Sequence, residues 1–275
     1  GLGLASWVGS ARWNNRTSRL VDRLEGPPSG ERQEIVAFRD LEHLPAPAAR
    51  YFRCVLREGQ PRIRSARIEW KGEFRTGRAD DGWRPFEATE HFSARPPGFV
   101  WDASIRMAPL MNVRVRDAYV AGEAAMQAKV LSLVPVVDER GKPELNAGAL
   151  HRYLAEAVWI PTALFPGAGV KWSPIDEHRA LATLTDSGVT VSLEFRFNTT
   201  GEITSVFTPG RYREVNGRYE STPWEGQFRK YEERSGMLIP TEGSVEWRLQ
   251  DGSFPYWRGR IVDVKYDFAW PENSA

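Results

Sequence analysis

Hydrophobic and polar residues alternate along most of the chain after the first sixty residues. Ile68, Trp70 and Phe74, for example, share one side of an extended strand, and charged residues lie between them. Similar segments follow one another closely, separated by short turns such as 77–82 and 95–98. Parallel strand pairs need long crossover connections, so these short turns predict antiparallel pairing.

We count about eleven or twelve such strands, taking the segment 124–137 as a single strand, and expect one sheet over residues 61–270. An open twisted sheet rarely grows beyond about ten strands, so this one should curl around an interior. The predicted fold is mainly β: a large curved antiparallel sheet or incomplete β-barrel. One helix interrupts the strands near 146–159, ends before Pro161 and is expected to cover the open side.

The first sixty residues have the spacing of helices rather than strands. We predict one helix in 16–26 and another in 44–59, and we treat 1–60 as a helical arm attached to the sheet. Residues 1–8 are apolar and three arginines follow them. The arm is therefore either an ordinary N-terminal extension or the remnant of a membrane-anchoring segment, through which the protein would associate with a membrane.

Composition narrows the classes of function. The chain has 37 Lys and Arg residues against 36 Asp and Glu residues, so it lacks the basic surplus of most nucleic-acid-binding proteins and no nucleic-acid partner is expected. The aromatic share of 12% suits strands and pockets for apolar ligands. The single cysteine, Cys54, cannot form an intramolecular disulfide and is expected to be a core thiol on the predicted helix.

The sequence contains no recognisable cofactor or catalytic signature. It has no glycine-rich phosphate loop before a helix and no nucleophile elbow. The four histidines, His43, His91, His151 and His178, are too far apart in the chain for the tight ligand spacing of a zinc site. We therefore expect neither a metal nor another cofactor.

Two acidic residues occupy otherwise apolar strand faces. Glu90 is in line with Phe86 and Phe92, and Asp117 is in line with Val115. A buried carboxylate must be hydrogen-bonded, paired with a cation or protonated. The two acids could therefore be acid and base groups of an enzyme, polar anchors for a ligand, or parts of a structural network with arginine inside the barrel.

Other candidate site residues are aromatic and basic. An enzyme would use Arg84 or Arg114 to stabilise an anion, and the interrupting helix would present aromatic rings to a ligand. The candidate ligand-binding residues are Trp83, Arg84, Glu90, Trp101, Arg114, Asp117, Tyr119, Tyr153 and Trp159. Arg152 and Glu156, four residues apart on the predicted helix, are expected to form a solvent-exposed ion pair.

The sequence also resembles a family of bacterial domains that has no assigned function. The resemblance runs from about residue 44 to 268 and rests on "WRPFEATEHFSARPPGFVWDASIRMAP", "AEAVWIPTALFP", "TPWEGQF" and "PTEGSVEW". No catalytic residue of that family can be carried over to this chain. Its members often have a hydrophobic N-terminal extension, and its fold is similar to the lipoprotein-carrier (LolA-like) half-barrel. The resemblance implies a lipid or other hydrophobic ligand and a place in the bacterial cell envelope.

Three functions agree with these observations. The first is binding of a hydrophobic or lipid-like ligand in the cavity of the curved sheet. The second is a metal- and nucleotide-independent enzyme that acts on an apolar substrate, with Glu90 or Asp117 as acid or base. The third is a structural domain of the envelope. The enzyme would need a pocket that holds two carboxyls with raised pKa, and the structural domain would have a filled interior.

Overall fold

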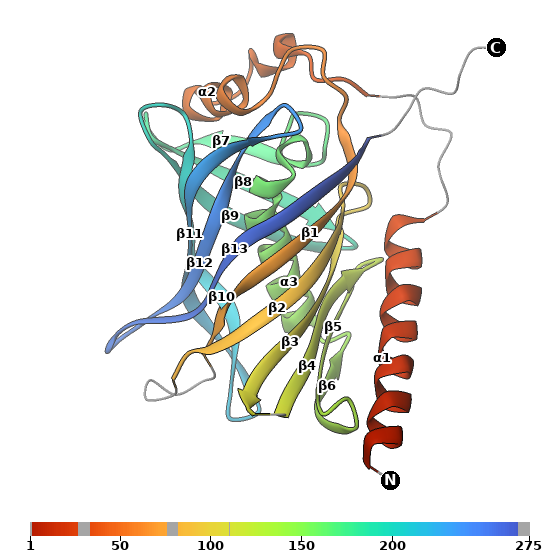
Figure 1. Cartoon of the computed structure of the whole chain (residues 1–275). Coiled ribbons are helices and arrows are strands. Elements are labelled where there is room, and N and C mark those ends of the chain that lie inside the picture. The colour runs from red at the N-terminus through yellow and green to blue at the C-terminus, as the bar shows by residue number, and fades with distance from the viewer. Residues whose placement is uncertain (1, 27–33, 76–81, 110, 269–275) are drawn as a thin grey trace, which may run out of the picture.

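The computed structural model describes residues 2–26, 34–75, 82–109 and 111–268 of the 275-residue chain. Within these ranges, thirteen strands form one sheet, which curls into a half-barrel (Figure 1). The strands are β1 (Ile63–Phe74), β2 (Arg84–Ser93), β3 (Gly98–Ala108), β4 (Met111–Val120), β5 (Glu123–Val130), β6 (Val134–Arg140), β7 (Lys171–Pro174), β8 (Arg179–Asp186), β9 (Val189–Phe197), β10 (Ile203–Val215), β11 (Arg218–Arg234), β12 (Met237–Leu249) and β13 (Gly252–Phe268). The helical segments are α1 (Leu2–Glu25), η1 (Phe38–Leu41), α2 (Ala46–Val55), α3 (Pro143–Glu156), η2 (Ala157–Trp159) and η3 (Pro161–Ala163).

The sheet consists of two antiparallel meanders that meet at the first and last strands. β1 to β6 are neighbours in chain order on one side, β7 to β13 are neighbours on the other, and β1 pairs with β13 in the middle. The strands at the two edges are short, with seven residues in β6 and four in β7. Short edge strands limit unwanted pairing with other chains. The predicted fold, a large curved antiparallel sheet that forms an incomplete barrel, is confirmed.

The thirteenth strand comes from a hairpin that the sequence pattern hides. The segment 124–137, expected to be one strand, folds back on itself between β5 and β6, and Val130 pairs with Val134. Leu131 and Ser132 form the turn with positive φ angles of 49° and 61°. Tight hairpin turns of this kind usually contain glycine or asparagine, so the expectation of one strand was wrong for lack of that signal.

α3 lies inside the curve of the sheet and contacts both meanders, β3 to β5 on one side and β8 to β10 on the other (Figure 1). It begins at Pro143, in the first turn, where the missing N–H of proline costs no helical hydrogen bond. Leu150 and Leu154 are fully buried. The helix predicted near 146–159 is thus confirmed, and it fills much of the concave side of the sheet.

α2 covers one end of the half-barrel (Figure 1). The apolar face predicted for this helix, Phe52, Val55 and Leu56, is buried. The Phe52 ring packs edge-on against Phe165, with ring centroids 5.3 Å apart. This packing ties the segment that precedes the sheet to the segment that follows α3.

α1 lies along the outer face of β2, β3 and β4, which is the face turned away from α3 (Figure 1). The helix runs from Leu2, well before the predicted start at residue 16. Trp13, Leu20 and Leu24 fall on one side of it, and Leu24 packs with Val100 of β3. No helix among the described residues is both long and apolar enough to cross a membrane.

Three glycines in register let aromatic rings lie against the backbone at the centre of the sheet. Gly72, Gly259 and Gly243 are direct neighbours on β1, β13 and β12. A Cβ atom on Gly259 would lie 2.7 Å from the Trp257 ring, and one on Gly243 would lie 3.1 Å from the Trp159 ring. Such distances leave no room for a side chain on the concave side.

Replacing Gly259 by alanine is therefore expected to lower the free energy of unfolding by about 1–3 kcal/mol, the usual cost of overpacking a core. Urea titration followed by far-UV circular dichroism gives the change as a shifted midpoint. Gly82→Ala is the control, because a Cβ at Gly82 meets no atom within 4 Å. Equal midpoints for the two variants would contradict the packing argument.

Candidate functional site

Three carboxylates surround one guanidinium group on the concave side of the sheet. Arg152 of α3 contacts Glu90 at 2.7 Å, Asp117 at 2.8 Å and Glu156 at 2.9 Å. Its guanidinium also lies over the Trp101 ring, 5.4 Å from the centroid. We call these five residues the Arg152 cluster. It joins the helix inside the curve to the strands β2, β3 and β4.

Strand register brings the acids of the Arg152 cluster together. Glu90 on β2 is directly opposite Trp101 on β3, and Trp101 is directly opposite Asp117 on β4. Residues opposite one another in antiparallel strands point to the same face, which here is the face toward α3. Arg152 and Glu156, one helical turn apart, complete the cluster from above the sheet.

Burial sets the protonation of the cluster. Burial raises the pKa of Glu90 well above its usual value, and the nearby Glu156 charge raises it further. Burial also raises the pKa of Glu156. Burial alone would lower the pKa of Arg152, but the carboxylates of Glu156, Glu90 and Asp117 outweigh it and raise that pKa. The guanidinium therefore stays charged, while Glu90 and Glu156 keep a proton at pH values where free carboxyls are ionised.

The geometry of the cluster favours a fixed network over an acid–base pair. The second carboxylate oxygen of Glu90 accepts a hydrogen bond of 2.9 Å from the Trp70 indole, so both of its oxygens are engaged. Asp117 and Glu156 are only 20% and 15% exposed, and both bind the same guanidinium. A carboxyl must reach a substrate proton to act as acid or base. These contacts match the structural arginine–acid network, which was one of the three alternatives for the two acids in the sequence analysis.

The structure places three other predicted aromatic residues in the core with their polar atoms satisfied. The Tyr119 hydroxyl donates to Asp186 at 2.6 Å, and the Tyr153 hydroxyl donates to the Ser93 carbonyl at 3.2 Å. The Trp159 indole donates to the Pro240 carbonyl at 3.1 Å. Each of these three side chains is at most 2% exposed. Their contacts account for their burial without a ligand.

The predicted arginines lie away from the two acids. Arg114 is on the outer face of β4, where it contacts Asp102 at 2.8 Å beneath α1. Arg84 is exposed at the start of β2 and donates to the Met107 carbonyl. The structure therefore brings neither arginine next to Glu90. The expectation that Arg152 and Glu156 form a solvent-exposed ion pair was wrong, because the Arg152 side chain is only 15% exposed.

The remaining titratable residues named from the sequence have local roles. Cys54 is partly buried against the core, and burial raises the pKa of its thiol. His151 is buried beside the Ala147 carbonyl, and burial lowers the pKa of its imidazole to about 4. His91 lies near Glu25 on the outer face. Among the described residues, no three His, Cys, Asp or Glu side chains form a group that could hold a metal.

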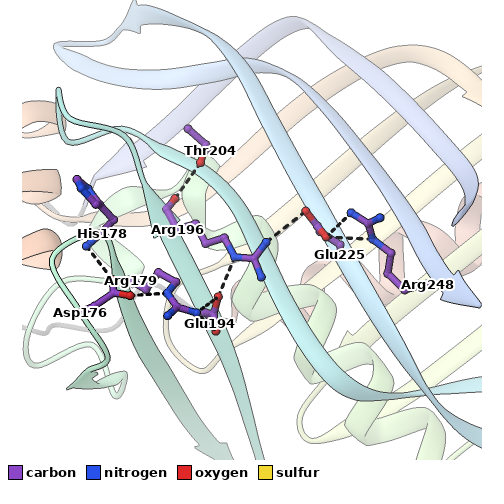
Figure 2. A network of polar contacts seen from close by, with 8 residues as sticks. All are labelled: Asp176, His178, Arg179, Glu194, Arg196, Thr204, Glu225 and Arg248. Carbon is purple, nitrogen blue, oxygen red and sulfur yellow. Dashed lines mark hydrogen bonds and ion pairs between the residues drawn. The ribbon is translucent and has the colours of Figure 1, made fainter.

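The outer face of the second meander carries a chain of paired charges (Figure 2). Arg179 on β8 contacts Glu194 on β9, which contacts Arg196 at 2.7 Å. Arg196 in turn lies 3.8 Å from Glu225 on β11, and Arg248 on β12 binds the same carboxylate at 2.7 Å. Acids and bases alternate across the strands, so this part of the surface is largely charge-balanced.

Apolar side chains gather at the end of the half-barrel where β3 ends and β4 begins. Some of them pack against the core yet remain partly exposed on the concave side: Phe74, Met107, Val113, Tyr256 and Trp257. We call these five residues the open-end patch. Beside it, a groove of about 360 Å³ is lined by Trp83, Arg84 and Met107 among others. Two of the predicted ligand-binding residues thus lie next to this patch rather than next to the Arg152 cluster.

Comparison with known proteins gives a family and distant structural similarities. A LolA superfamily protein from Nitrosomonas europaea is 13% identical, with a TM-score of 0.42 over 84% of this chain and 93% of that chain. A beta-barrel-like protein of the family DUF1849 from Brucella abortus is 9% identical, with a TM-score of 0.23 over 75% of this chain and 99% of that chain. No curated protein matches the sequence. Residues 42–266 match a family of unknown function, DUF6920, and because they make up most of the chain, the protein belongs to that family.

Proposed function

We propose that the protein binds a hydrophobic or lipid-like molecule at the open end of the half-barrel. The observation that carries the proposal is the open-end patch, where Phe74, Met107 and Val113 remain partly exposed although they face the concave side. Apolar area left exposed inside a curved sheet gains free energy when a ligand covers it. The resemblance to the lipoprotein-carrier half-barrel, stated from the sequence, agrees with such a ligand.

The neighbouring groove is further support for a ligand site at the open end of the half-barrel. Its volume of about 360 Å³ is within the usual range for small-molecule sites, and apolar atoms make up most of its lining. Trp83 gives the groove an aromatic wall, and Arg84 could accompany a polar head. The ligand would lie against the ends of β2, β3 and β4, while the deeper interior stays filled by α3 and its neighbours.

Titration with the fluorescent probe N-phenyl-1-naphthylamine tests this proposal. The protein is expected to enhance probe fluorescence, and oleic acid is expected to displace the probe. Val113→Lys should weaken probe binding about tenfold, because it places a charge in the contact area. Val262→Lys is the matched control, since Val262 is 50% exposed on β13 and lies outside the patch.

The outcomes separate binding from a structural role. Equal probe affinity in both valine variants would place the contact elsewhere. Absence of probe binding by the unaltered protein, together with a clean mass in native mass spectrometry without detergent, would favour the structural alternative. Circular dichroism of Val113→Lys shows whether the variant keeps its fold.

A further inference from the structure

A second and larger hollow lies on the outer face, over the four central strands of the sheet. This outer groove has a volume of about 580 Å³, within the usual range for small-molecule sites. Trp70 on β1 and Phe228 on β11 face the core, so the residues next to them point outward. The outward-facing lining residues include Lys71, Gln227, Arg229, Glu242, Arg258 and Arg260.

Three glycines contribute backbone to the lining of the outer groove. Gly72, Gly243 and Gly259 line it, and these are the three glycines that lie in register across β1, β12 and β13. Trp83 also lines the groove, with the Arg258 guanidinium 4.4 Å from its ring centroid. The hollow is therefore bounded by polar side chains, two aromatic rings and glycine backbone.

Each carboxylate that lines the outer groove already has a cationic partner. Glu73 pairs with Arg258 within the groove. Glu242 pairs with Lys230 at 2.6 Å, and that lysine is not part of the lining. The third carboxylate, Glu246, pairs with Arg248 at 2.9 Å. The acids of the groove are thus neutralised, and two of their partners lie outside its lining.

Two arginines of the same groove have no carboxylate partner. Arg229 donates to the Gln227 amide oxygen at 2.8 Å, and no described acid forms an ion pair with Arg229 or Arg260. The two arginines share one cross-strand row, because both are register neighbours of Glu242. Two strand spacings of about 4.8 Å separate them, so extended guanidinium groups can converge on one anion. Lys71 continues the row on β1.

We propose that the outer groove binds a phosphate-bearing polar molecule, with Arg229 and Arg260 as its phosphate ligands. Guanidinium groups present paired N–H donors that match phosphate oxygens, and charge-assisted hydrogen bonds of this kind are short and strong. The Gln227 amide and the Ser244 hydroxyl at the same surface suit hydroxyl groups next to the phosphate. A soluble sugar phosphate and a phospholipid headgroup share this chemistry. Trp257 belongs to the open-end patch and also lines the outer groove, but Arg229 and Arg260 lie outside that patch.

Isothermal titration of the full chain with glucose 6-phosphate is the first arm of the test, with inorganic phosphate and glucose titrated separately. Cosedimentation with phosphatidylcholine vesicles, with and without phosphatidylglycerol, is the second arm. Arg229→Gln and Arg260→Gln are each expected to weaken binding about tenfold in whichever arm shows it. Arg218→Gln is the matched control, an exposed arginine at the start of β11 outside the groove.

The two arms identify the source of the phosphate. Binding of the sugar phosphate alone assigns a soluble ligand, and binding of phosphatidylglycerol vesicles alone assigns a headgroup. No binding in either arm overturns the proposal, as does binding that the three glutamine variants weaken equally. Probe binding at the open-end patch should be the same in Arg260→Gln as in the unaltered protein, so failure of one site leaves the other testable.

Discussion

Arg152→Met is expected to lower the free energy of unfolding by about 3–5 kcal/mol at neutral pH, the usual cost of removing one partner from a buried ion pair. The substitution leaves Glu90, Asp117 and Glu156 around an apolar side chain of similar length. Glu90 is only 1% exposed, so water cannot replace the lost guanidinium at its oxygens. The Trp70 indole and the Glu156 carboxyl would then be the remaining hydrogen-bond partners of Glu90.

The loss should depend on pH in a definite direction. Burial raises the folded-state pKa of Glu90 and Glu156, so the folded protein binds more protons than the unfolded chain above the usual carboxyl pKa. Stability contributed by these groups is therefore fully present below the usual pKa and is lost as pH rises through the raised values. Arg152 opposes that loss by stabilising the charged forms. Without it the destabilisation should be smallest near pH 4 and largest near pH 8.

Urea unfolding of Arg152→Met and the unaltered protein near pH 5 and pH 8 measures both effects. Arg218→Met controls for loss of an exposed guanidinium and should leave the midpoint unchanged within error. Adding Glu90→Gln to Arg152→Met should recover part of the loss, because one of the unpaired charges is removed. A pH-independent loss, or one below about 1 kcal/mol at pH 8, would show that the carboxylates find other partners.

The strands were predictable because each has one buried face. Alternation alone placed Ile68 and Trp70 on the same face of their strand, and the structure buries both. Pro161 marked the end of the interrupting helix for the local reason that proline cannot continue it. The hairpin at Leu131 and Ser132 was missed because its turn depends on backbone angles that these residues seldom adopt. Local rules thus recover elements but not every turn.

The site was only half predictable. Glu90 and Asp117 were recognised as inward acids, because a strand fixes the direction of its side chains. Their partner Arg152 was assigned to solvent, since the spacing to Glu156 describes contacts within one helix only. A signal was present nonetheless: Leu150 and its apolar neighbours surround that helix on most sides, which is typical of a buried helix. The spacing of residues within a helix cannot predict which strands that helix packs against, because those contacts join segments that are far apart in the sequence.

The outer charges of β3 and β4 show the same limit. Asp102 and Arg116 look like a solvated face in sequence, yet α1 covers them, and Arg116 is 2% exposed. Burial lowers the pKa of Arg116 to about 10, so it still carries its charge at neutral pH. The pattern Trp13, Thr17 and Leu20 follows a helical stripe and could have predicted a packed helix. This helical pattern could not predict which strands α1 covers.

Trp13 holds α1 to the sheet, so Trp13→Ala is expected to release the helix. The indole N–H donates to both carboxylate oxygens of Asp102, at 3.0 and 2.9 Å. The ring lies beneath the guanidinium groups of Arg116 and Arg114, at 4.1 and 5.6 Å from its centroid. Removing a buried tryptophan usually costs about 3–5 kcal/mol. In this protein the loss should destabilise the packing of α1 on the sheet, because few apolar contacts besides those of Leu20, Val21 and Leu24 hold the helix there.

Hydrogen exchange by mass spectrometry tests this release peptide by peptide. Amides of α1 should exchange about a hundredfold faster in Trp13→Ala, while those of β11 and β12 keep their protection. Trp7→Ala provides the control within the same helix, because Trp7 is 70% exposed whereas Trp13 is 3% exposed. If both variants leave α1 equally protected, the polar contacts of Asp102 and Arg116 with the Thr17 hydroxyl must hold the helix without the ring. Faster exchange throughout the sheet would instead mean that α1 stabilises the whole half-barrel, since its loss would then expose the outer face of β2 to β4 and unfold the strands together.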